Sequence, residues 1–587
     1  MAVEGTARPR GTGGARRRAV RRGGLGTLLL VVALPLWAAA GAPVKEDSTN
    51  PGAAVATAHP VATAAAFEIL EAGGNAFDAA VAVTATLAVV EPYGSGLGGG
   101  GFWLLAGDDT PAVMVDGRET APAEAHRDLY LDADGERREG ASMDGPLAAG
   151  IPGTPAALAH ITREHGRLEL AENLRPAIRA AREGVEVTAT YRRLAAFRRD
   201  ALAASDDAAA IFLDDGAVPS EGHRFTQPAL AELLERLADE GPAAFYEGEF
   251  AETLVAGVRA EGGIWTLADL ADYRVVEREP VRSTYDGWTL TAAAPPSSGG
   301  VVLAQTLNIL AGHEREEAAE ADRLHFVVEA LRRAYRDRNA YLGDPDHVEM
   351  PLERLLDPAY AAGQRASIHP RRATDSEALP PVVDAGGGPS TTHFSLLDAE
   401  GNRVSATLSI NYPFGSGFMP PGTGVLLNNE MDDFAAEPGR PNAYGLVQGE
   451  ANAVGPGRRP LSSMTPTFLE KGDRLAILGT PGGSRIITTV LQAAFGVMDG
   501  DGAAAIAERP RYHHQYLPDV IEHEPSAIPA AVREALAERG HAFDEVRPFG
   551  DLQLVLRRGD VLEAASDPRG EGEAVVRPVV LAPANAD

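Results

Sequence analysis

Two runs of alternating residues near position 400 constrain the fold of this chain most strongly. Residues 391–398 read TTHFSLLD and residues 403–411 read RVSATLSIN, with Glu400, Gly401 and Asn402 in the connection between them. This pattern predicts two antiparallel strands joined at a glycine-containing turn. The first strand begins abruptly, because the preceding segment DAGGGPS, residues 384–390, has the composition of a flexible linker.

The predicted hairpin brings a small set of polar side chains together. Antiparallel pairing puts Thr391 beside the stretch from Ser409 to Asn411, and the two-residue period of a strand places Ser409 and Asn411 on the face of Thr391. On spacing alone, an ordinary polar hairpin face is the simpler interpretation.

The rest of the chain divides by the secondary-structure pattern of its sequence. Residues 155–370 are rich in helical patterns, whereas alternating and β-branched runs predominate from Thr391 onward. Nearer the N-terminus, HPVATAAAFEILEAGGN predicts a helix that stops at Gly73 and Gly74. The run AFDAAVAVTATLAVVEP predicts a second, buried helix with Asn75 as its N-cap. The chain has 587 residues, of which 44% are hydrophobic, so it can bury a large core.

The first 42 residues predict an export signal. A basic region, RPRGTGGARRRAVRRGG, precedes the apolar stretch LGTLLLVVALPLWAAAGA, which ends in Ala40-Gly41-Ala42. A retained membrane anchor is the alternative, but the stretch is short for a bilayer span and contains Pro35. Residues 1–42 carry seven arginines and one acid, so their removal changes the net charge from −30 to −36. This acidity argues against nucleic acid or an anionic membrane as a partner.

The residue types present exclude several kinds of site. The chain has no cysteine, which excludes disulfides, thiolate metal sites and a cysteine nucleophile. Gly94, Gly96 and Gly99 fit the spacing G-x-G-x-x-G, but a helix pattern precedes them and a strand pattern follows, the reverse of a dinucleotide-binding context. The neighbouring His513 and His514 point to opposite faces if they lie in a strand, so we expect no metal site there.

Cleavage before Thr391 would give the hairpin a chemical function. A new N-terminal threonine carries a hydroxyl nucleophile and an α-amine with a pKa of about 7.7 to 8.0, so a usable general base sits on the same residue. The linker that ends at Ser390 has the composition of a flexible segment that can be cleaved, although most glycine-rich linkers serve only as connections between structured elements.

Several motifs, in order along the chain, resemble the gamma-glutamyltransferase family, also called gamma-glutamyltranspeptidase or glutathione hydrolase. They include SGLGGGGF, DGRETAPA, GPLAAGIPGT, PPSSGG, TTHFSLLDAEGN, LLNNEMDDF, NAVGPGRRPLSSMTPT and GTPGGSRIITTVLQ, and the resemblance spans roughly residue 50 to the C-terminus. It implies a four-layer αββα sandwich of the N-terminal-nucleophile hydrolase type. It also implies self-cleavage between Ser390 and Thr391 into a large subunit, residues 43–390, and a small subunit, residues 391–587.

The same resemblance assigns roles to individual residues. Thr391 matches the nucleophile, and Ser409 occupies the position of a second threonine that hydrogen-bonds it; serine keeps the hydroxyl and loses the methyl that restricts the rotamer. Gly482 and Gly483 match the oxyanion hole. The positions that hold the α-amino group of a γ-glutamyl unit are Asn411, Glu430 and Asp433, and those that bind its α-carboxylate are Arg118, Ser462 and Ser463.

The segment EPGRPNAYGLVQGEAN resembles a lid loop found in some members of the family, with Tyr444 reaching toward Asn411. A surface excursion is the alternative for a loop of this composition.

The activity implied is a two-step transfer without a cofactor or metal. Thr391 attacks the γ-amide of glutathione or a related donor, and water, an amino acid or a peptide then accepts the acyl group. The chemical alternatives are a relative specialised for glutaryl or β-lactam side chains, and an uncleaved binding protein that has lost turnover. The acidic residues Glu430, Asp432 and Asp433 favour a donor with an α-amine, because an unpaired buried carboxylate is costly.

Overall fold

The computed structural model describes residues 52–108, 110–313, 318–379, 391–435 and 449–579. The signal segment predicted at residues 1–42, the linker with Ser390, and Tyr444 lie outside the described residues. Residues 47–587 belong to one compact unit, which is the subject of the description below.

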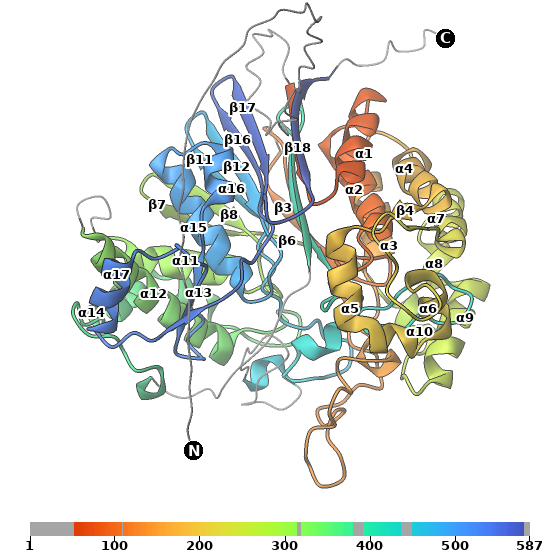
Figure 1. Cartoon of the computed structure of the whole chain (residues 1–587), viewed down its shortest axis with the longest axis horizontal. Coiled ribbons are helices and arrows are strands. Elements are labelled where there is room, and N and C mark those ends of the chain that lie inside the picture. Colours follow the sequence, from red (N-terminus) through yellow and green to blue (C-terminus); the bar gives the residue numbers. More distant parts are fainter. Residues whose placement is uncertain (1–51, 109, 314–317, 380–390, 436–448, 580–587) are drawn as a thin grey trace, which may run out of the picture. The chain divides into compact units, whose positions relative to one another are not determined.

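Two antiparallel sheets form the centre of this unit (Figure 1). The seven-stranded sheet has the order β18-β1-β9-β10-β2-β3-β6 and the six-stranded sheet the order β17-β16-β12-β11-β8-β7. The strands of the first are β1 (Gly52–Thr57), β2 (Gly100–Ala106), β3 (Val113–Asp116), β6 (Val276–Arg278), β9 (Thr392–Leu397), β10 (Arg403–Ser409) and β18 (Glu573–Pro578). Those of the second are β7 (Val281–Tyr285), β8 (Trp288–Ala292), β11 (Thr467–Lys471), β12 (Arg474–Gly479), β16 (Gln553–Arg558) and β17 (Val561–Ser566).

Helices cover the outer face of each sheet (Figure 1). Over the seven-stranded sheet lie α1 (Pro60–Glu71), α2 (Ala76–Val90), α3 (Thr154–His165), α4 (Leu170–Glu183), α5 (Ala189–Ala203), α6 (Asp206–Phe212), α7 (Pro228–Glu240), α8 (Ala243–Tyr246), α9 (Gly248–Ala260) and α10 (Leu267–Ala271). On the other side lie α11 (Gly299–Leu310), α12 (Glu320–Tyr341), α13 (Leu352–Leu356), α14 (Pro358–Ala366), α15 (Arg485–Asp499), α16 (Ala503–Glu508) and α17 (Ala530–Ala537). Smaller sheets are formed by β13 (Tyr512–His513), β14 (Ile521–His523) and β15 (Phe543–Glu545), and by β4 (Val185–Glu186) and β5 (Arg224–Phe225).

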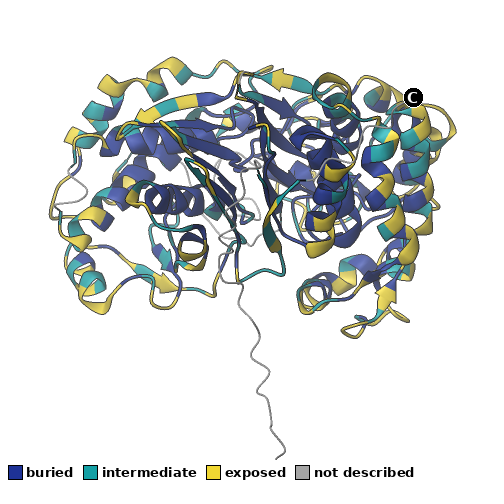
Figure 2. Cartoon of the chain, turned by 90° about the horizontal axis from the view of Figure 1, so that it is seen from above, coloured by how far each residue is buried: buried dark blue, intermediate teal, exposed yellow. Residues whose placement is uncertain are grey.

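The two-residue period of the strands explains the layering. In β2, Trp103 and Leu105 pack with the helices over the seven-stranded sheet, whereas Phe102 and Leu104 pack with residues of the six-stranded sheet. Both faces of β2 are therefore buried, and its seven residues are apolar or glycine throughout. Figure 2 shows the buried residues concentrated on the sheets and on the helix faces toward them. The predicted four-layer αββα sandwich is confirmed.

The helix predictions near the N-terminus are confirmed. Helix α1 ends just before Gly73, whose φ of 98° is accessible to glycine and strained for other residues. Helix α2 begins after Asn75, whose side chain accepts hydrogen bonds from the backbone of Phe77 and Asp78, while Asp78 accepts from the Asn75 backbone in return. Every residue of α2 is buried, as its continuous apolar sequence requires.

Segments on either side of residue 390 are interleaved in the sheets. In the seven-stranded sheet, β9 and β10 lie between β1 and β2, and β18 lies beyond β1. In the six-stranded sheet, β11 pairs with β8. A cut before Thr391 would leave two chains joined by strand pairing in both sheets. Within the described residues, no helix is long and apolar enough to cross a bilayer.

Candidate active site

The pairing of β9 with β10 determines where Thr391 lies. Thr392 is paired with Leu408, so the next position along the register places Thr391 opposite Ser409. The turn between the strands uses Gly401 with a φ of 87°, and Asp398 accepts hydrogen bonds from the backbone of Glu400 and Asn402 at 2.9 Å each. The hairpin predicted from the sequence is confirmed, including its turn.

The chain reverses direction directly after β10. The backbone N–H of Asn411 donates to Ser409 Oγ at 2.7 Å, and Asn411 Nδ2 donates to the carbonyl of Asn429 at 2.9 Å. Asn411 has a φ of 71°, a left-handed conformation that asparagine tolerates better than most residues. These contacts fix Ser409 and Asn411 beside Thr391.

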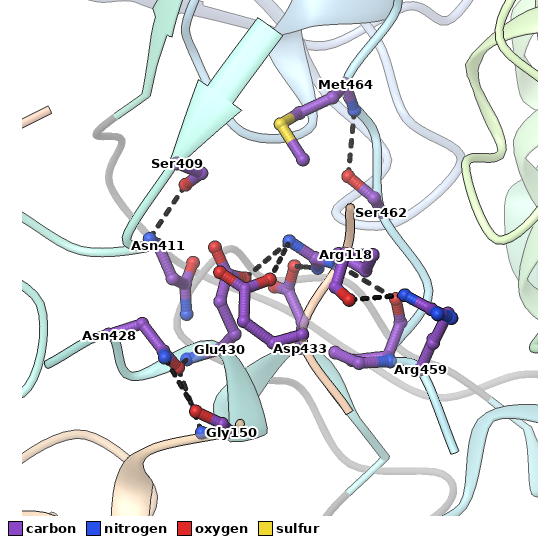
Figure 3. A network of polar contacts seen from close by, with 12 residues as sticks. Arg118, Gly150, Ser409, Asn411, Asn428, Glu430, Asp433, Arg459, Ser462 and Met464 are labelled. Carbon is purple, nitrogen blue, oxygen red and sulfur yellow. Dashed lines mark hydrogen bonds and ion pairs between the residues drawn. The ribbon is translucent and has the colours of Figure 1, made fainter. Parts of the chain in front are cut away.

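A buried ion-pair cluster lies next to this turn (Figure 3). Arg118 Nη1 is 2.7 Å from Glu430 Oε2, and Arg118 Nη2 donates to Asp433 Oδ2 at 2.5 Å. The arginine follows β3, and Arg459 donates to its backbone carbonyl. Burial raises the pKa of both carboxyls, strongly for Glu430; the Arg118 charge opposes this effect, and the neighbouring acids add to it. When both carboxyls are ionised, this part of the site holds more negative than positive charge.

Asp432 does not belong to this cluster. Its Oδ1 accepts hydrogen bonds from Ser142 Oγ at 2.6 Å and Arg137 Nη2 at 2.8 Å. The expectation that Glu430, Asp432 and Asp433 together favour a donor with an α-amine is therefore wrong for Asp432, which is paired elsewhere. Asp432 is absent from the pocket lining, and the other two already contact Arg118.

Serines and glycines form another part of the site. The Ser462 N–H donates to the carbonyl of Pro296, and the Ser462 carbonyl accepts from the backbone of Ser298 at 2.8 Å. Gly482 and Gly483, with φ of 142° and 58°, precede Ser484, the N-cap of α15. Neither glycine N–H donates to an acceptor in the part of the chain that the structure describes. The helix dipole of α15 adds partial positive charge at this point.

These groups open into one pocket. Most of the site residues proposed from the sequence line it, except Glu430 and Gly482, which adjoin lining residues, and the undescribed Tyr444 and Ser390. The lining is Arg118, Arg338, Thr391, Ser409, Asn411, Asp433, Leu461, Ser462, Ser463, Met464, Gly483, Ser484 and Ile486.

The glycine-rich loop that begins at Gly94 packs behind the site. A Cβ atom on Gly98 would collide with the carbonyl oxygen of Leu426, and one on Gly99 would collide with that of Ser409. Helix α2 precedes this loop and β2 follows it, as the sequence indicated. The glycines therefore allow close backbone contact with the end of β10.

The buried carboxylate of Glu91 contacts Thr392, the residue after Thr391. Glu91 Oε2 accepts a hydrogen bond from Thr392 Oγ1 at 2.7 Å, and Glu91 Oε1 accepts from the Tyr93 hydroxyl at 3.2 Å. Burial raises the pKa of Glu91 to about 7, although both hydrogen bonds favour its charged form.

The histidines singled out in the sequence make separate hydrogen bonds. His513 contacts Thr488 Oγ1 and Gln515 Oε1, each at 2.8 Å, whereas His514 Nε2 is 3.3 Å from Asp519 Oδ1. Burial lowers the pKa of both rings. His393, in β9, is also fully buried, and burial lowers its pKa to about 3, so it stays neutral.

Comparisons with known proteins agree with this geometry. The family model described as gamma-glutamyltranspeptidase matches residues 62–577. A glutathione hydrolase proenzyme from Pseudomonas sp. (strain A14) is 41% identical over 541 residues, covering 91% of this chain and 93% of the relative. The chain belongs to the gamma-glutamyltranspeptidase family.

Acylases also resemble this gamma-glutamyltranspeptidase family member. The Acylase ACY 1 proenzyme of Pseudomonas sp. (strain V22) is 37% identical over 554 residues, covering 92% of this chain and 96% of the relative. The crystal structure of cephalosporin acylase from Bacillus halodurans superimposes with a TM-score of 0.78 at 28% identity, covering 92% of this chain and 98% of that one. Substrate choice must therefore be argued from the pocket.

Sequence reasoning missed part of the pocket wall, notably Arg338. This residue lies on α12, whose Leu331, Ala334 and Tyr335 are fully buried at the spacing of one helix face. Arg338 continues that face one turn later. An arginine on an otherwise apolar helix face is the sequence feature from which Arg338 could have been predicted.

The glycine loop gives a matched pair of variants. Gly98→Ala places a Cβ against the Leu426 carbonyl and should lower the thermal midpoint and the yield of soluble protein, with a cost of about 1–3 kcal/mol or more. Gly96→Ala is the control, because its nearest neighbour would be Ile410 Cγ2 at 3.5 Å, an ordinary contact. Equal thermal midpoints for the two variants would contradict this account of the loop.

Glu91 should make stability depend on pH. Its pKa is raised from 4.5 to about 7, so between these values the unfolded chain loses a proton that the folded protein keeps, and stability falls as pH rises. Above pH 7 the loss amounts to up to about 3 kcal/mol. Glu91→Gln should therefore melt at a higher temperature than the wild type at pH 8, and the difference should vanish near pH 4.5. A wild-type advantage at pH 8 would show that the charged form is stabilised.

Proposed function

We propose that this chain is an exported, self-processing gamma-glutamyltransferase and glutathione hydrolase. After removal of residues 1–42, cleavage between Ser390 and Thr391 yields a large subunit, 43–390, and a small subunit, 391–587, which remain together through the interleaved sheets. The substrates are glutathione and related γ-glutamyl donors, with water, amino acids or dipeptides as acceptors. The same proposal puts the protein in the periplasm or outside the cell.

The first step forms an ester on Thr391. Its Oγ attacks the γ-carbonyl carbon while its own α-amine takes the hydroxyl proton. The oxyanion that develops is stabilised by the backbone N–H groups of Gly482 and Gly483, which have no acceptor among the described residues. The C–N bond then breaks, and the α-ammonium returns the proton to the departing amine, cysteinylglycine in the case of glutathione.

The second step releases the acyl group. Water or an acceptor amine loses a proton to the α-amine of Thr391 and attacks the ester carbonyl, again through an oxyanion at the two glycines. The ester C–O bond breaks, and the proton returns to Thr391 Oγ. Ser409, opposite Thr391 in the register, orients the hydroxyl through these steps.

The observation that carries the proposal is the polarity of the pocket around Thr391. Glu430 and Asp433 give one end more negative charge than Arg118 balances, and an ammonium that binds there relieves the repulsion between them. Ser462 and Ser463 offer hydroxyl groups that can donate to a carboxylate. A donor with both an ammonium and a carboxylate on its α-carbon fits both groups of residues.

An acylase that accepts glutaryl or β-lactam side chains is the second candidate, favoured by the acylase relatives and by the pairing of Glu430 and Asp433 with Arg118. Glutaryl compounds keep a carboxylate but lack the α-amine. Such a donor would gain nothing from the excess negative charge beside Arg118.

The two candidates separate in one assay with the purified, processed protein. We expect γ-glutamyl-p-nitroanilide to be cleaved with a kcat/KM at least about tenfold above that of glutaryl-p-nitroanilide. This ratio should increase with pH above 4.5, the ordinary Glu pKa, because the raised pKa values of Glu430 and Asp433 delay the ionisation that an ammonium needs. Titration of the Thr391 amine affects both donors and cancels in the ratio.

Asp433→Asn tests the same assignment at one residue. The amide keeps the shape of the carboxylate without its charge, so kcat/KM for the γ-glutamyl donor should fall by about 10- to 100-fold while the glutaryl donor changes little. A wild-type enzyme that prefers the glutaryl donor would identify an acylase instead.

A further inference from the structure

Arg338 is a buried cation in the wall of the active-site pocket. It lies near the end of α12 with 1% of its surface exposed, and it lines the pocket together with Thr391 and Ser463. None of the steps above uses it.

The hydrogen-bond partners of Arg338 are all neutral. Nε donates to Ser298 Oγ at 2.8 Å, Nη1 to Asn339 Oδ1 at 3.1 Å, and Nη2 to Ser463 Oγ at 3.1 Å. Burial lowers the pKa of this guanidinium to about 10, with Tyr335 and Asp433 acting in the opposite direction. Arg338 therefore carries its charge at any pH near neutrality.

The lack of a carboxylate partner distinguishes Arg338 from comparable residues. Among the buried arginines that the structure describes, it alone has no carboxylate oxygen within 4.0 Å. The others are Arg118, Arg198, Arg332, Arg333, Arg403, Arg459 and Arg511. An uncompensated buried charge is costly, so its position in a substrate pocket indicates that the missing anion arrives with the ligand.

We infer that Arg338 is a specificity-determining residue that selects acyl donors bearing an α-carboxylate, by supplying the unbalanced positive charge and by orienting Ser463. Because Ser463 Oγ accepts a hydrogen bond from Arg338, its own hydroxyl hydrogen is free to donate to the carboxylate. This inference rests on the proposed function and deepens it.

The two arginines that line the pocket then have different roles in donor binding. The charge of Arg118 is offset by Glu430 and Asp433, so that end attracts the ammonium of the donor. Arg338 has no carboxylate oxygen within 4.0 Å and feels Asp433 only at longer range, so the region of Arg338 and Ser463 attracts the carboxylate. Arg118 also lines the pocket and remains able to contact the same carboxylate.

The test compares two donors that differ only in the α-carboxylate: γ-glutamyl-p-nitroanilide and 4-aminobutanoyl-p-nitroanilide. The variants are Arg338→Gln and Arg338→Met, which remove the charge, and Arg338→Lys, which keeps it. We expect the charge-free variants to raise KM for the γ-glutamyl donor by about 10- to 100-fold, with a smaller change in kcat. Cleavage of 4-aminobutanoyl-p-nitroanilide should be nearly unchanged, and Arg338→Lys should recover part of the preference.

Arg333→Gln is the matched structural control. Arg333 lies on the same helix, is also buried and is paired with Glu329 at 2.7 Å, but it does not line the pocket. This variant should melt at a lower temperature and keep the wild-type ratio between the two donors. A merely structural role for Arg338 would give the same pattern in its own variants.

The outcomes separate this inference from the proposed function. A wild-type enzyme without activity on γ-glutamyl-p-nitroanilide would overturn the proposed function itself. A wild-type preference for the carboxylate-bearing donor that survives in the Arg338 variants would overturn only the role of Arg338. If neither charge-free variant is processed, Arg338→Lys is compared with the wild type, because lysine keeps the charge but lacks the guanidinium that orients Ser463. A preference for the γ-glutamyl donor over the 4-aminobutanoyl donor that is about tenfold lower than in the wild type supports the inference, and an unchanged preference contradicts it.

Discussion

The register between β9 and β10 determines the geometry of the whole site. Thr392 faces Leu408, which puts Thr391 opposite Ser409 at the end of the central strand pair. That pair lies inside the seven-stranded sheet, with β1 on one side and β2 on the other, so neither strand can slip without moving its buried face. The tight packing of Gly98 and Gly99 against Leu426 and Ser409 holds the end of β10 from behind.

Charge is distributed unevenly around this fixed point. Arg118 is surrounded by carboxylates, whereas Arg338 has neutral hydrogen-bond partners, and both line the same pocket as Thr391. A donor with an ammonium and a carboxylate on one carbon supplies an opposite charge for each of these two regions. A glutaryl donor would compensate only one. The distribution of charge, more than the shape of the fold, therefore separates a transferase from the acylases that share this architecture.

Much of this arrangement could be predicted from the sequence because it depends on local patterns. The alternation in residues 391–411 predicted the hairpin, and Asn75 with Asp78 marked the start of α2. The motifs that contain Arg118, Asn411, Glu430 and Ser462 pointed to residues that the fold brings together. The partners of buried charges could not be predicted, because they come from distant parts of the chain. Asp432 pairs with Arg137 and Ser142, while Glu430 and Asp433, in the same short segment, pair with Arg118. Arg338 belongs to a helix whose function no motif indicated.

The central claim is that Thr391 becomes an N-terminal residue and acts as the nucleophile. The most direct test is the intact mass and N-terminal sequence of the purified, exported protein, beside a Thr391→Ala variant. The account predicts two fragments from the wild type, the smaller one beginning Thr391-Thr392-His393, and a single chain from the variant. A wild-type protein that stays in one piece and binds glutamate or glutathione without cleaving the amide would contradict the account and identify a binding protein with this fold.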